Sequence, residues 1–397
     1  MIAEDMVALG MHKSVIREIF EYSKKRGAQI GPEHVFDFSI GNPNVPAPQS
    51  VHQAIRELLE REDDIYLHGY TSAQGDMETR KAIAENLNER FGTHFHQDNL
   101  YMTCGAAASL RIILEAIHEE GDEIITFTPF FPEYRVFVEN SGAKLVPVHT
   151  NPDTFQIDFD KLECAFSEHT KAVIVNSPNN PSGVIFPEEA IQKLAAVLEE
   201  KEKIYGHAIC LIADEPYREL VYDGREVPYI TKYYKNTVVC YSYSKSLSLP
   251  GERIGYLLIP DEMEQAKELY AAVCGAGRAL GFVCAPSLFQ HVVRRCTGQV
   301  SDLSIYKKNR DLLYHALTEY GYSCVYPDGA FYLFVKSMEA DTDAFCERAK
   351  KYELLVVPSE SFGCSGYVRI AYCVSTAQIE NALPAFKKLA EEYKAAK

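Results

Sequence analysis

The chain lacks any uninterrupted apolar run of the ~20 residues that a membrane-spanning helix needs, so no membrane segment is expected. Its first residues, Met1-Ile2-Ala3-Glu4-Asp5, carry acids early and lack a basic stretch followed by an apolar one, which argues against a signal peptide. Basic residues are also the minority, with 40 Lys and Arg against 56 Asp and Glu and a formal net charge of −16. An acidic chain of this kind is a poor binder of nucleic acid or anionic membranes, although a local cationic pocket for small anions stays compatible with it.

Paired cysteine motifs are missing as well. The eleven cysteines include no C-x-x-C pair, and their odd number in a chain without a secretory signal indicates reduced thiols in a cytoplasmic protein. Cys104, Cys210, Cys240 and Cys373 stand beside apolar runs, which is typical of small core residues. We therefore expect no metal site.

The 397 residues contain no internal repeat and no low-complexity tract, and they suffice for two domains. From about residue 99 onward, apolar runs alternate with helical stretches, which predicts an α/β fold with a largely parallel sheet buried on both faces. Two helices are predicted between these runs, Ala107–His118 and Pro187–Lys203. The expected strands are Leu100–Thr103, Glu123–Thr126, Lys144–Val148, Ala172–Val175, Ile209–Ala213, Thr237–Tyr241 and Ile254–Ile259.

The character of the chain changes after about residue 286, where helical stretches dominate. Helices are predicted at Lys13–Lys25, Ser287–Cys296, Ser301–Tyr320 and Ala377–Ala396, and strands at Ala330–Lys336 and Tyr367–Ala371. We expect residues 286–397 to form a smaller α+β domain and residues 46–285 a large ligand-binding domain. Residues 1–45, which lead through Phe36–Ile40 into Gly41-Asn42-Pro43, are expected to pack with the small domain.

The segment from Ser242 to Gly255 is the most informative in the chain. It follows an apolar run and combines Lys245 with nearby hydroxyls and with Arg253, eight residues further on. A lysine at the end of a buried strand, beside phosphate-binding groups, is the arrangement that holds pyridoxal phosphate: the amine forms a Schiff base and the hydroxyls and guanidinium bind the phosphate. Taken alone, a lysine in a Ser-rich loop is more often simply solvated.

Two further apolar runs end in polar side chains. Ala172–Val175 leads into Asn176-Ser177-Pro178-Asn179-Asn180-Pro181, where the Asn180 side chain could donate to a ring ligand at the carboxyl end of the sheet. Leu211-Ile212-Ala213 ends at Asp214, whose buried carboxylate needs a cation such as a protonated pyridine nitrogen. Tyr217 could then reach the ring's phenolic oxygen. A simple turn and a helix N-cap are the competing interpretations of Asn180 and Asp214.

Three weaker signals agree with this chemistry. The small-residue turn at Gly105 precedes a helix, and helix N-termini bind phosphate through backbone N–H groups. Phe131 could stack on a flat heterocycle, although a core aromatic is the simpler interpretation. Arg369 lies inside the apolar run of residues 367–372, so it needs an anion, which is either a ligand carboxylate or an internal acid.

Taken together, these residues resemble the fold-type I pyridoxal-phosphate enzymes, in particular the class I/II aminotransferases related to aspartate aminotransferase. The resemblance spans about Phe36 to Arg369 and the closing helix. It implies a three-layer large domain with a mostly parallel seven-stranded sheet, plus a smaller α+β domain. The matching positions, in chain order, are Gly41, Tyr70, the Gly105 turn, Phe131, Asn180, Asp214, Tyr217, Lys245, Arg253 and Arg369.

The resemblance also implies a role for each position. Lys245 is the Schiff-base lysine and the base that moves a proton between Cα and the cofactor, while Phe131 stacks on the ring. The α-carboxylate of the substrate is held by Arg369, Asn180 and the Gly41 backbone. The phosphate is bound by backbone N–H groups of Gly105, Ala106 and Ala107, by Ser242 and by Arg253. The phosphate turn departs from many relatives, which carry a hydroxyl or lysine side chain where this chain has Ala.

Members of this family share active sites across a two-fold interface, so the resemblance implies a homodimer. Tyr70 resembles the tyrosine that reaches the phosphate of the neighbouring subunit. Arg278 falls near the region where dicarboxylate-specific members place a side-chain-binding arginine of the partner, although a surface or interface arginine fits equally well.

The leading hypothesis is therefore an aminotransferase that moves the α-amino group of an L-amino acid to a 2-oxo acid, with aspartate or another dicarboxylic or aromatic amino acid as the candidate donor. The alternative is a C–S β-lyase acting on cystathionine or cysteine conjugates, since the same Lys, Asp and Arg serve both reactions. A cofactor-sensing regulatory domain is a third class. It is disfavoured because the chain is acidic and offers no N-terminal extension for a DNA-binding module.

Overall fold

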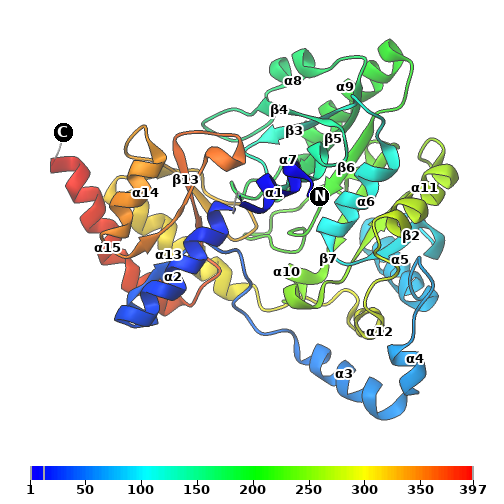
Figure 1. Ribbon diagram of the computed structural model, residues 1–397, viewed down its shortest axis with the longest axis horizontal. Helices are drawn as coiled ribbons and strands as arrows, with labels where there is room; N and C mark the ends of the chain where they lie inside the picture. Colours follow the sequence, from blue (N-terminus) through cyan, green and yellow to red (C-terminus); the bar gives the residue numbers. More distant parts are fainter. Residues whose placement is uncertain (1, 12–13, 396–397) are drawn as a thin grey trace.

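The computed structural model describes residues 2–11 and 14–395. In Figure 1, α13 (Ser304–Tyr320), α14 (Thr342–Lys350), α15 (Thr376–Ala395) and β13 (Tyr367–Ala371) gather at one end of the molecule. The larger sheet and its covering helices lie at the other end. No described helix is both long enough and apolar enough to span a bilayer.

The larger sheet has seven strands in the order β2-β8-β7-β6-β5-β3-β4. All neighbouring pairs are parallel except the two that involve β8, which runs antiparallel to β2 and β7. Each strand lies within two residues of its predicted bounds. The strands are β2 (Leu100–Thr103), β3 (Glu123–Thr128), β4 (Lys144–His149), β5 (Thr170–Asn176), β6 (Cys210–Asp214), β7 (Thr237–Ser242) and β8 (Gly255–Leu258).

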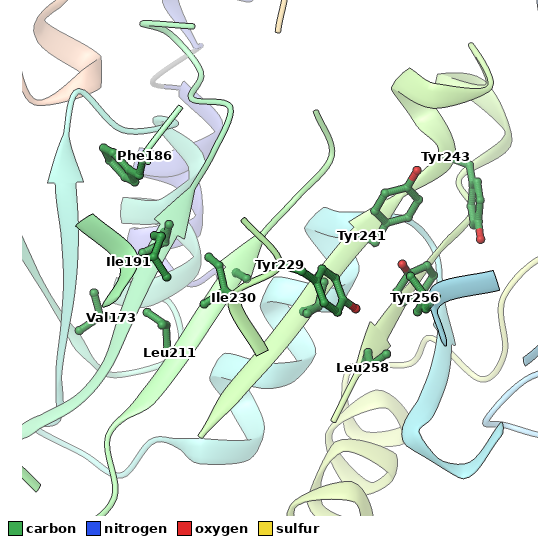
Figure 2. Packing of buried hydrophobic residues seen from close by; sticks show 14 of the residues in the cluster. Val173, Phe186, Ile191, Leu211, Tyr229, Ile230, Tyr241, Tyr243, Tyr256 and Leu258 are labelled. Atoms are coloured by element: carbon green, nitrogen blue, oxygen red, sulfur yellow. The ribbon is translucent and has the colours of Figure 1, made fainter. Parts of the chain in front are cut away.

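Alternating side chains explain why this sheet is buried on both faces. In β5, Val173 and Val175 join one apolar cluster, whereas Ala172 and Ile174 join the cluster on the opposite face. Figure 2 shows part of the first of these clusters, to which Val173 of β5 and Ile191 of α9 (Glu188–Tyr205) both belong. Two layers of helices therefore enclose the sheet, as the predicted three-layer α/β fold requires.

One helical layer consists of α6 (Ala106–Ile117), α7 (Glu133–Glu139) and α11 (Ala266–Ala279), which pack in the cluster that contains Ile174. The opposite cluster takes side chains from α3 (Gln49–Arg61), α5 (Met77–Phe91), α9 and α12 (Ser287–Cys296). No helix or strand was predicted within residues 46–98, where α3, α4 (Asp64–His68) and α5 lie. The short helices α7, α8 (Phe159–Ala165), α10 (Tyr243–Ser246) and α14, and the longer α11, were also not predicted.

The smaller sheet is antiparallel, in the order β12-β13-β10-β9. It contains β13 at its predicted bounds, together with β9 (Ser323–Cys324), β10 (Tyr332–Lys336) and β12 (Val357–Pro358). Helices α13, α14 and α15 pack with it in a third apolar cluster. This is the smaller sheet-containing part that the sequence predicts.

Both ends of the chain contribute to this smaller part. Helix α2 (Val15–Ile30) covers most of the predicted helix at Lys13–Lys25, and Lys13 lies outside the described residues. Helix α15 likewise covers the predicted Ala377–Ala396 except Ala396, which is also outside them. A further helix, α1 (Glu4–Met11), precedes α2. Strand β1 (Phe36–Asp37) pairs in parallel with β11 (Leu354–Leu355), so the segment after α2 joins the C-terminal part.

Candidate functional site

A cavity of about 400 Å³ lies at the carboxyl edge of the seven-stranded sheet. Residues of both sheets line it, because Tyr332 and Arg369 come from β10 and β13. Eleven of the residues predicted from sequence share this lining: Gly41, Ala106, Ala107, Phe131, Asn180, Asp214, Tyr217, Ser242, Lys245, Arg253 and Arg369. Segments that are far apart in the sequence therefore meet at one site.

The sheet topology explains this convergence. Strands β5, β6 and β7 are neighbours and run in parallel, so the residues that follow them emerge at the same edge. Asp214 ends β6, Ser242 ends β7, and Asn180 follows β5 within four residues. Gly105 follows β2 and begins α6 at the same edge, since β2 is antiparallel to β8, which is antiparallel to β7.

Lys245 lies in the four-residue helix α10, directly after β7. Ser242 caps this helix by accepting a hydrogen bond from the backbone N–H of Ser244, which fixes the direction in which the lysine leaves the strand. The Lys245 amine donates to the carbonyl oxygen of Gly41 at 2.7 Å. Burial lowers the pKa of this amine to about 8, because an enclosed ammonium loses its hydration.

Asp214 is 4% exposed, and its two oxygens have different surroundings. Oδ2 accepts a hydrogen bond from the Tyr134 hydroxyl, whereas Oδ1 has no partner among the described residues. Burial raises the pKa of Asp214 to about 7, because desolvation disfavours the carboxylate. Tyr134 was not predicted as a site residue, although it lies in the segment that supplied Phe131. The helix N-cap interpretation of Asp214 does not apply, since β6 leads into a turn.

Tyr217 and Tyr332 form a second buried pair in the wall of the cavity. Their hydroxyl oxygens lie 2.9 Å apart, and both side chains are at most 5% exposed. Burial raises the pKa of Tyr332 to about 12 and that of Tyr217 well above its usual range, so both hydroxyls keep their protons at neutral pH. Tyr332 was not predicted either.

Arg369 is buried without an acidic partner among the described residues, so the internal Glu or Asp considered from sequence is absent there. Its guanidinium donates to Asn180 Oδ1 at 3.1 Å and to the carbonyl oxygen of Ser39. Its Nε has no partner among the described residues. The guanidinium also lies over the rings of Tyr332 and Phe362, at 4.7 and 5.2 Å from their centroids. A cation held this way is oriented but not neutralised.

The Gly105 turn forms a cradle against Arg253. Gly105 has a φ of 90°, and a Cβ added there would lie 2.7 Å from Arg253 Nη2. Arg253 donates to the Pro250 carbonyl at 3.0 Å and to Ser244 Oγ at 3.4 Å. The Ser244 hydroxyl in turn lies 2.7 Å from that of Ser242. Backbone N–H groups at the start of α6, two hydroxyls and a guanidinium therefore surround one corner of the cavity.

Two predicted residues lie away from this cavity within one chain. Tyr70 is 90% exposed, and Arg278 is exposed in the last turn of α11. Neither lines the cavity. The aromatic ring of Phe131 does line it and packs edge-on against Tyr134 at 5.7 Å. Ser14, Ile16, Arg17 and Glu133 line it as well, and none of them was predicted as a site residue.

Comparisons with known proteins agree with this geometry. The sequence model of the family "Aminotransferase class I and II" matches residues 33–386. A crystal structure of an amino transferase from Eubacterium rectale is 60% identical, with a TM-score of 0.97, and the match covers 99% of each chain.

Two curated relatives are more distant. The aspartate/prephenate aminotransferase of Thermus thermophilus is 28% identical over 88% of this chain and 90% of its own. Aromatic-amino-acid aminotransferase 2 of Thermococcus litoralis is 26% identical over 97% of both chains. These relatives do not favour the C–S β-lyase alternative. The chain belongs to the class I and II aminotransferases and is an aminotransferase with an aspartate aminotransferase fold.

Proposed function

We propose that the chain binds pyridoxal 5′-phosphate in this cavity and transfers the α-amino group of an L-amino acid to a 2-oxo acid. The observation that carries the proposal is the meeting of an enclosed amine, a buried carboxylate with a free oxygen and an unneutralised guanidinium in one cavity of about 400 Å³: Lys245, Asp214 and Arg369. Each of these groups is costly to bury alone, so a ligand with complementary groups accounts for all three.

The residues present fit this cofactor. Oδ1 of Asp214 is an unpartnered buried acceptor, which suits the protonated nitrogen of a pyridine ring. Because Gly105 has no side chain, its backbone lies close to the Arg253 guanidinium, and a glycine turn beside a cation suits a phosphate. We propose that this phosphate is bound by the backbone N–H groups of Gly105, Ala106 and Ala107, by Ser242 and by Arg253.

Pyridoxal phosphate supplies a carbonyl that captures amines and a cationic ring that accepts the electron pair of a broken Cα bond. Asp214 would keep the ring nitrogen protonated, because a neighbouring carboxylate stabilises that positive charge. Tyr217 and the amide nitrogen of Asn180 would donate to the ring oxygen, and Phe131 would stack on the ring face.

Lys245 is the proposed base. An unperturbed lysine, with a pKa of ~10.4, holds its proton too tightly near neutrality to act efficiently. Burial lowers the pKa of this amine to about 8, so a useful fraction is neutral at physiological pH. Its nitrogen would take a proton from the substrate Cα and deliver it to the carbonyl carbon of the cofactor.

Arg369 would bind the substrate α-carboxylate bidentately, assisted by Asn180 and the backbone of Gly41. The names of the relatives suggest a dicarboxylic donor such as aspartate, or an aromatic one. The apolar residues Ile40 and Leu110 in the cavity lining would suit an aromatic side chain. Arg278 of a second subunit would suit a second carboxylate.

We further propose a cytoplasmic homodimer in which Tyr70 of each subunit reaches the phosphate of the other. The exposure of Tyr70 in a single chain supports this role, since a tyrosine that is 90% exposed has its ring free for a partner. In this assignment residues 46–285 form the cofactor-binding domain, residues 286–397 the small domain, and residues 1–45 a segment that packs with it. Substrates are small molecules, with no nucleic acid or membrane partner.

The testing experiment mixes the cofactor-loaded protein with single L-amino acids in the absence of an oxo acid. Loss of the yellow absorption with release of one oxo acid per site is expected, and the fastest donor identifies the substrate. Lys245→Ala should abolish both changes, whereas Lys144→Ala, an exposed lysine on β4, should alter neither. Continuing release of ammonia and pyruvate, with the yellow form retained, would contradict the proposal and indicate a β-lyase.

A further inference from the structure

Tyr332 contacts three separate parts of the candidate site. Its hydroxyl lies 2.9 Å from that of Tyr217, and the Arg369 guanidinium lies over its ring at 4.7 Å from the ring centroid. A Cβ added to Gly41 would lie 1.9 Å from the same hydroxyl, so the Gly41 backbone passes directly over it. Tyr332 itself is 2% exposed and stands at the first position of β10.

The direction of the hydroxyl pair follows from the number of protons. Each hydroxyl has one proton to donate, and both tyrosines keep their protons at neutral pH because burial raises each pKa. If the Tyr217 proton is directed to a ligand oxygen, the Tyr217 oxygen must accept, and Tyr332 is then the donor. A hydroxyl that accepts one hydrogen bond becomes a stronger donor in the next.

We infer that Tyr332 is a positioning residue that couples the two halves of the site: its hydroxyl orients Tyr217 toward the cofactor ring oxygen, and its ring orients Arg369 toward the substrate carboxylate. This inference rests on the proposed function. It goes beyond that function because it assigns the ring and the hydroxyl of one side chain to two different measurable properties, the acidity of the bound cofactor and the affinity for carboxylates.

The two contributions are separable by substitution. Tyr332→Phe removes the hydroxyl and keeps the ring under Arg369, whereas Tyr332→Leu removes both. The Tyr217 hydroxyl stabilises an anionic ring oxygen of the cofactor most when the cofactor has lost its own proton nearby. Weakening this donor therefore disfavours the deprotonated form of the cofactor. The absorption of the bound cofactor records this proton release directly, without turnover.

The experiment titrates the absorption of cofactor-loaded variants with pH and measures KM for several amino acids. Tyr332→Phe should raise the midpoint pH of this absorption titration by about one unit, which is a tenfold change in the acidity of the cofactor, and should leave KM unchanged. Tyr332→Leu should raise the midpoint equally and also raise KM about tenfold for every amino acid. Tyr322→Phe serves as the matched control, because Tyr322 is buried in the same apolar cluster and its hydroxyl donates to the Phe386 carbonyl instead.

A double variant tests the coupling itself. When Tyr217 is already phenylalanine, Tyr332→Phe should not raise the midpoint pH further, since its effect passes through the Tyr217 hydroxyl. A midpoint that stays at the wild-type value in Tyr332→Phe, or two shifts that simply add in the double variant, would overturn the inference. Wild-type protein that neither binds the cofactor nor releases an oxo acid would contradict the proposed function instead, so the two failures are distinguishable.

Discussion

Tyr134 donates a hydrogen bond to one oxygen of Asp214 and leaves the other oxygen without a described partner. Both side chains are at most 4% exposed. The tyrosine orients the carboxylate but adds no positive charge, so the negative charge of Asp214 is stabilised only in part. Without a cationic ligand Asp214 is therefore a group that destabilises the folded chain whenever it is ionised.

The first prediction concerns the pH dependence of the cofactor-free protein. Burial raises the pKa of Asp214 from 3.8 to about 7, so between these values the folded state binds a proton that the unfolded state has released. Stability must then fall as pH rises through this window, and the full penalty is present above pH 7. Asp214→Asn should flatten this decline and raise the melting temperature of the cofactor-free protein at pH 8, measured by thermal denaturation across pH 4 to 8.

Tyr134→Phe gives the reciprocal comparison. Loss of the donor should raise the pKa of Asp214 further and extend the decline to higher pH, because the carboxylate then loses the hydrogen bond from Tyr134. Cofactor should largely cancel the penalty in wild type and in Tyr134→Phe, but not add stability to Asp214→Asn to the same degree. A stability profile that is identical in wild type and Asp214→Asn would rule out this account of the carboxylate.

The second prediction concerns Arg369, which lacks an anion among the described residues although it is 2% exposed. Arg369→Ala should raise KM for all amino acids by about two orders of magnitude, since truncating one partner of a buried charge pair costs about 2–5 kcal/mol. The cofactor spectrum without substrate should change little. Steady-state kinetics with several amino acids, alongside equilibrium binding of an unreactive dicarboxylate, measures the effect.

Arg135→Ala is the matched control for Arg369. Arg135 lies on α7 two residues after Glu133, which lines the cavity, but it is exposed and pairs with Glu139. Its removal should leave KM unchanged for every substrate. Equal losses in the two variants would mean that the effect is a general one of positive charge, and that Arg369 makes no specific contact with the carboxylate.

The third prediction concerns the Gly105 cradle. Gly105→Ala should weaken cofactor binding about tenfold or more, because the new Cβ would lie 2.7 Å from Arg253 Nη2 and the φ of 90° disfavours a side chain. Gly206→Ala is matched for conformation, with a φ of 77° and open space around it. It should cost stability but leave cofactor affinity unchanged. Fluorescence titration of the cofactor-free variants with the cofactor distinguishes the two. Equal cofactor affinities in Gly105→Ala and Gly206→Ala would contradict a role of the cradle in phosphate binding.

The sequence was sufficient for the large sheet because each of its strands is a short apolar run with its own turn signals. β5 and β6 are buried along almost their whole length, so their limits coincide with the limits of the apolar runs. The strands that were missed, β1, β9, β11 and β12, have two residues each and form only because longer elements hold them in place. The same applies to α7, which has seven residues.

The site divides in a similar way. Asp214 ends β6 and Lys245 follows β7 by three residues, so both fit a local pattern that predicted their place at the carboxyl edge of the sheet. Tyr134 and Tyr332 were not, because each acts through a residue 80 or 115 positions away in the chain. Their sequence neighbourhoods look like ordinary apolar core, and only the tertiary contact distinguishes a tyrosine that donates to Asp214 from one that fills space.

The fourth prediction tests whether Tyr70 acts in the site of the other subunit. Tyr70→Ala and Lys245→Ala chains should each have little activity alone. In a hybrid dimer, one site would combine Lys245 of the first chain with Tyr70 of the second and would be complete. The other site would carry both defects. Random pairing of equal amounts makes about half of the dimers hybrid, so about a quarter of the wild-type activity should return.

Co-expression with two different affinity tags isolates the hybrid for this measurement. The matched control pairs Lys245→Ala with Asp214→Asn, since both of these residues line the same cavity within one chain. That hybrid contains no complete site and should stay inactive. If the Tyr70 hybrid also stays inactive while the isolated protein is dimeric, Tyr70 serves its own chain or only the interface. Recovery in the Tyr70 hybrid alone would establish that each active site needs both subunits. The prediction rests on a Tyr70 ring that is 90% exposed in one chain and does not line the cavity of that chain.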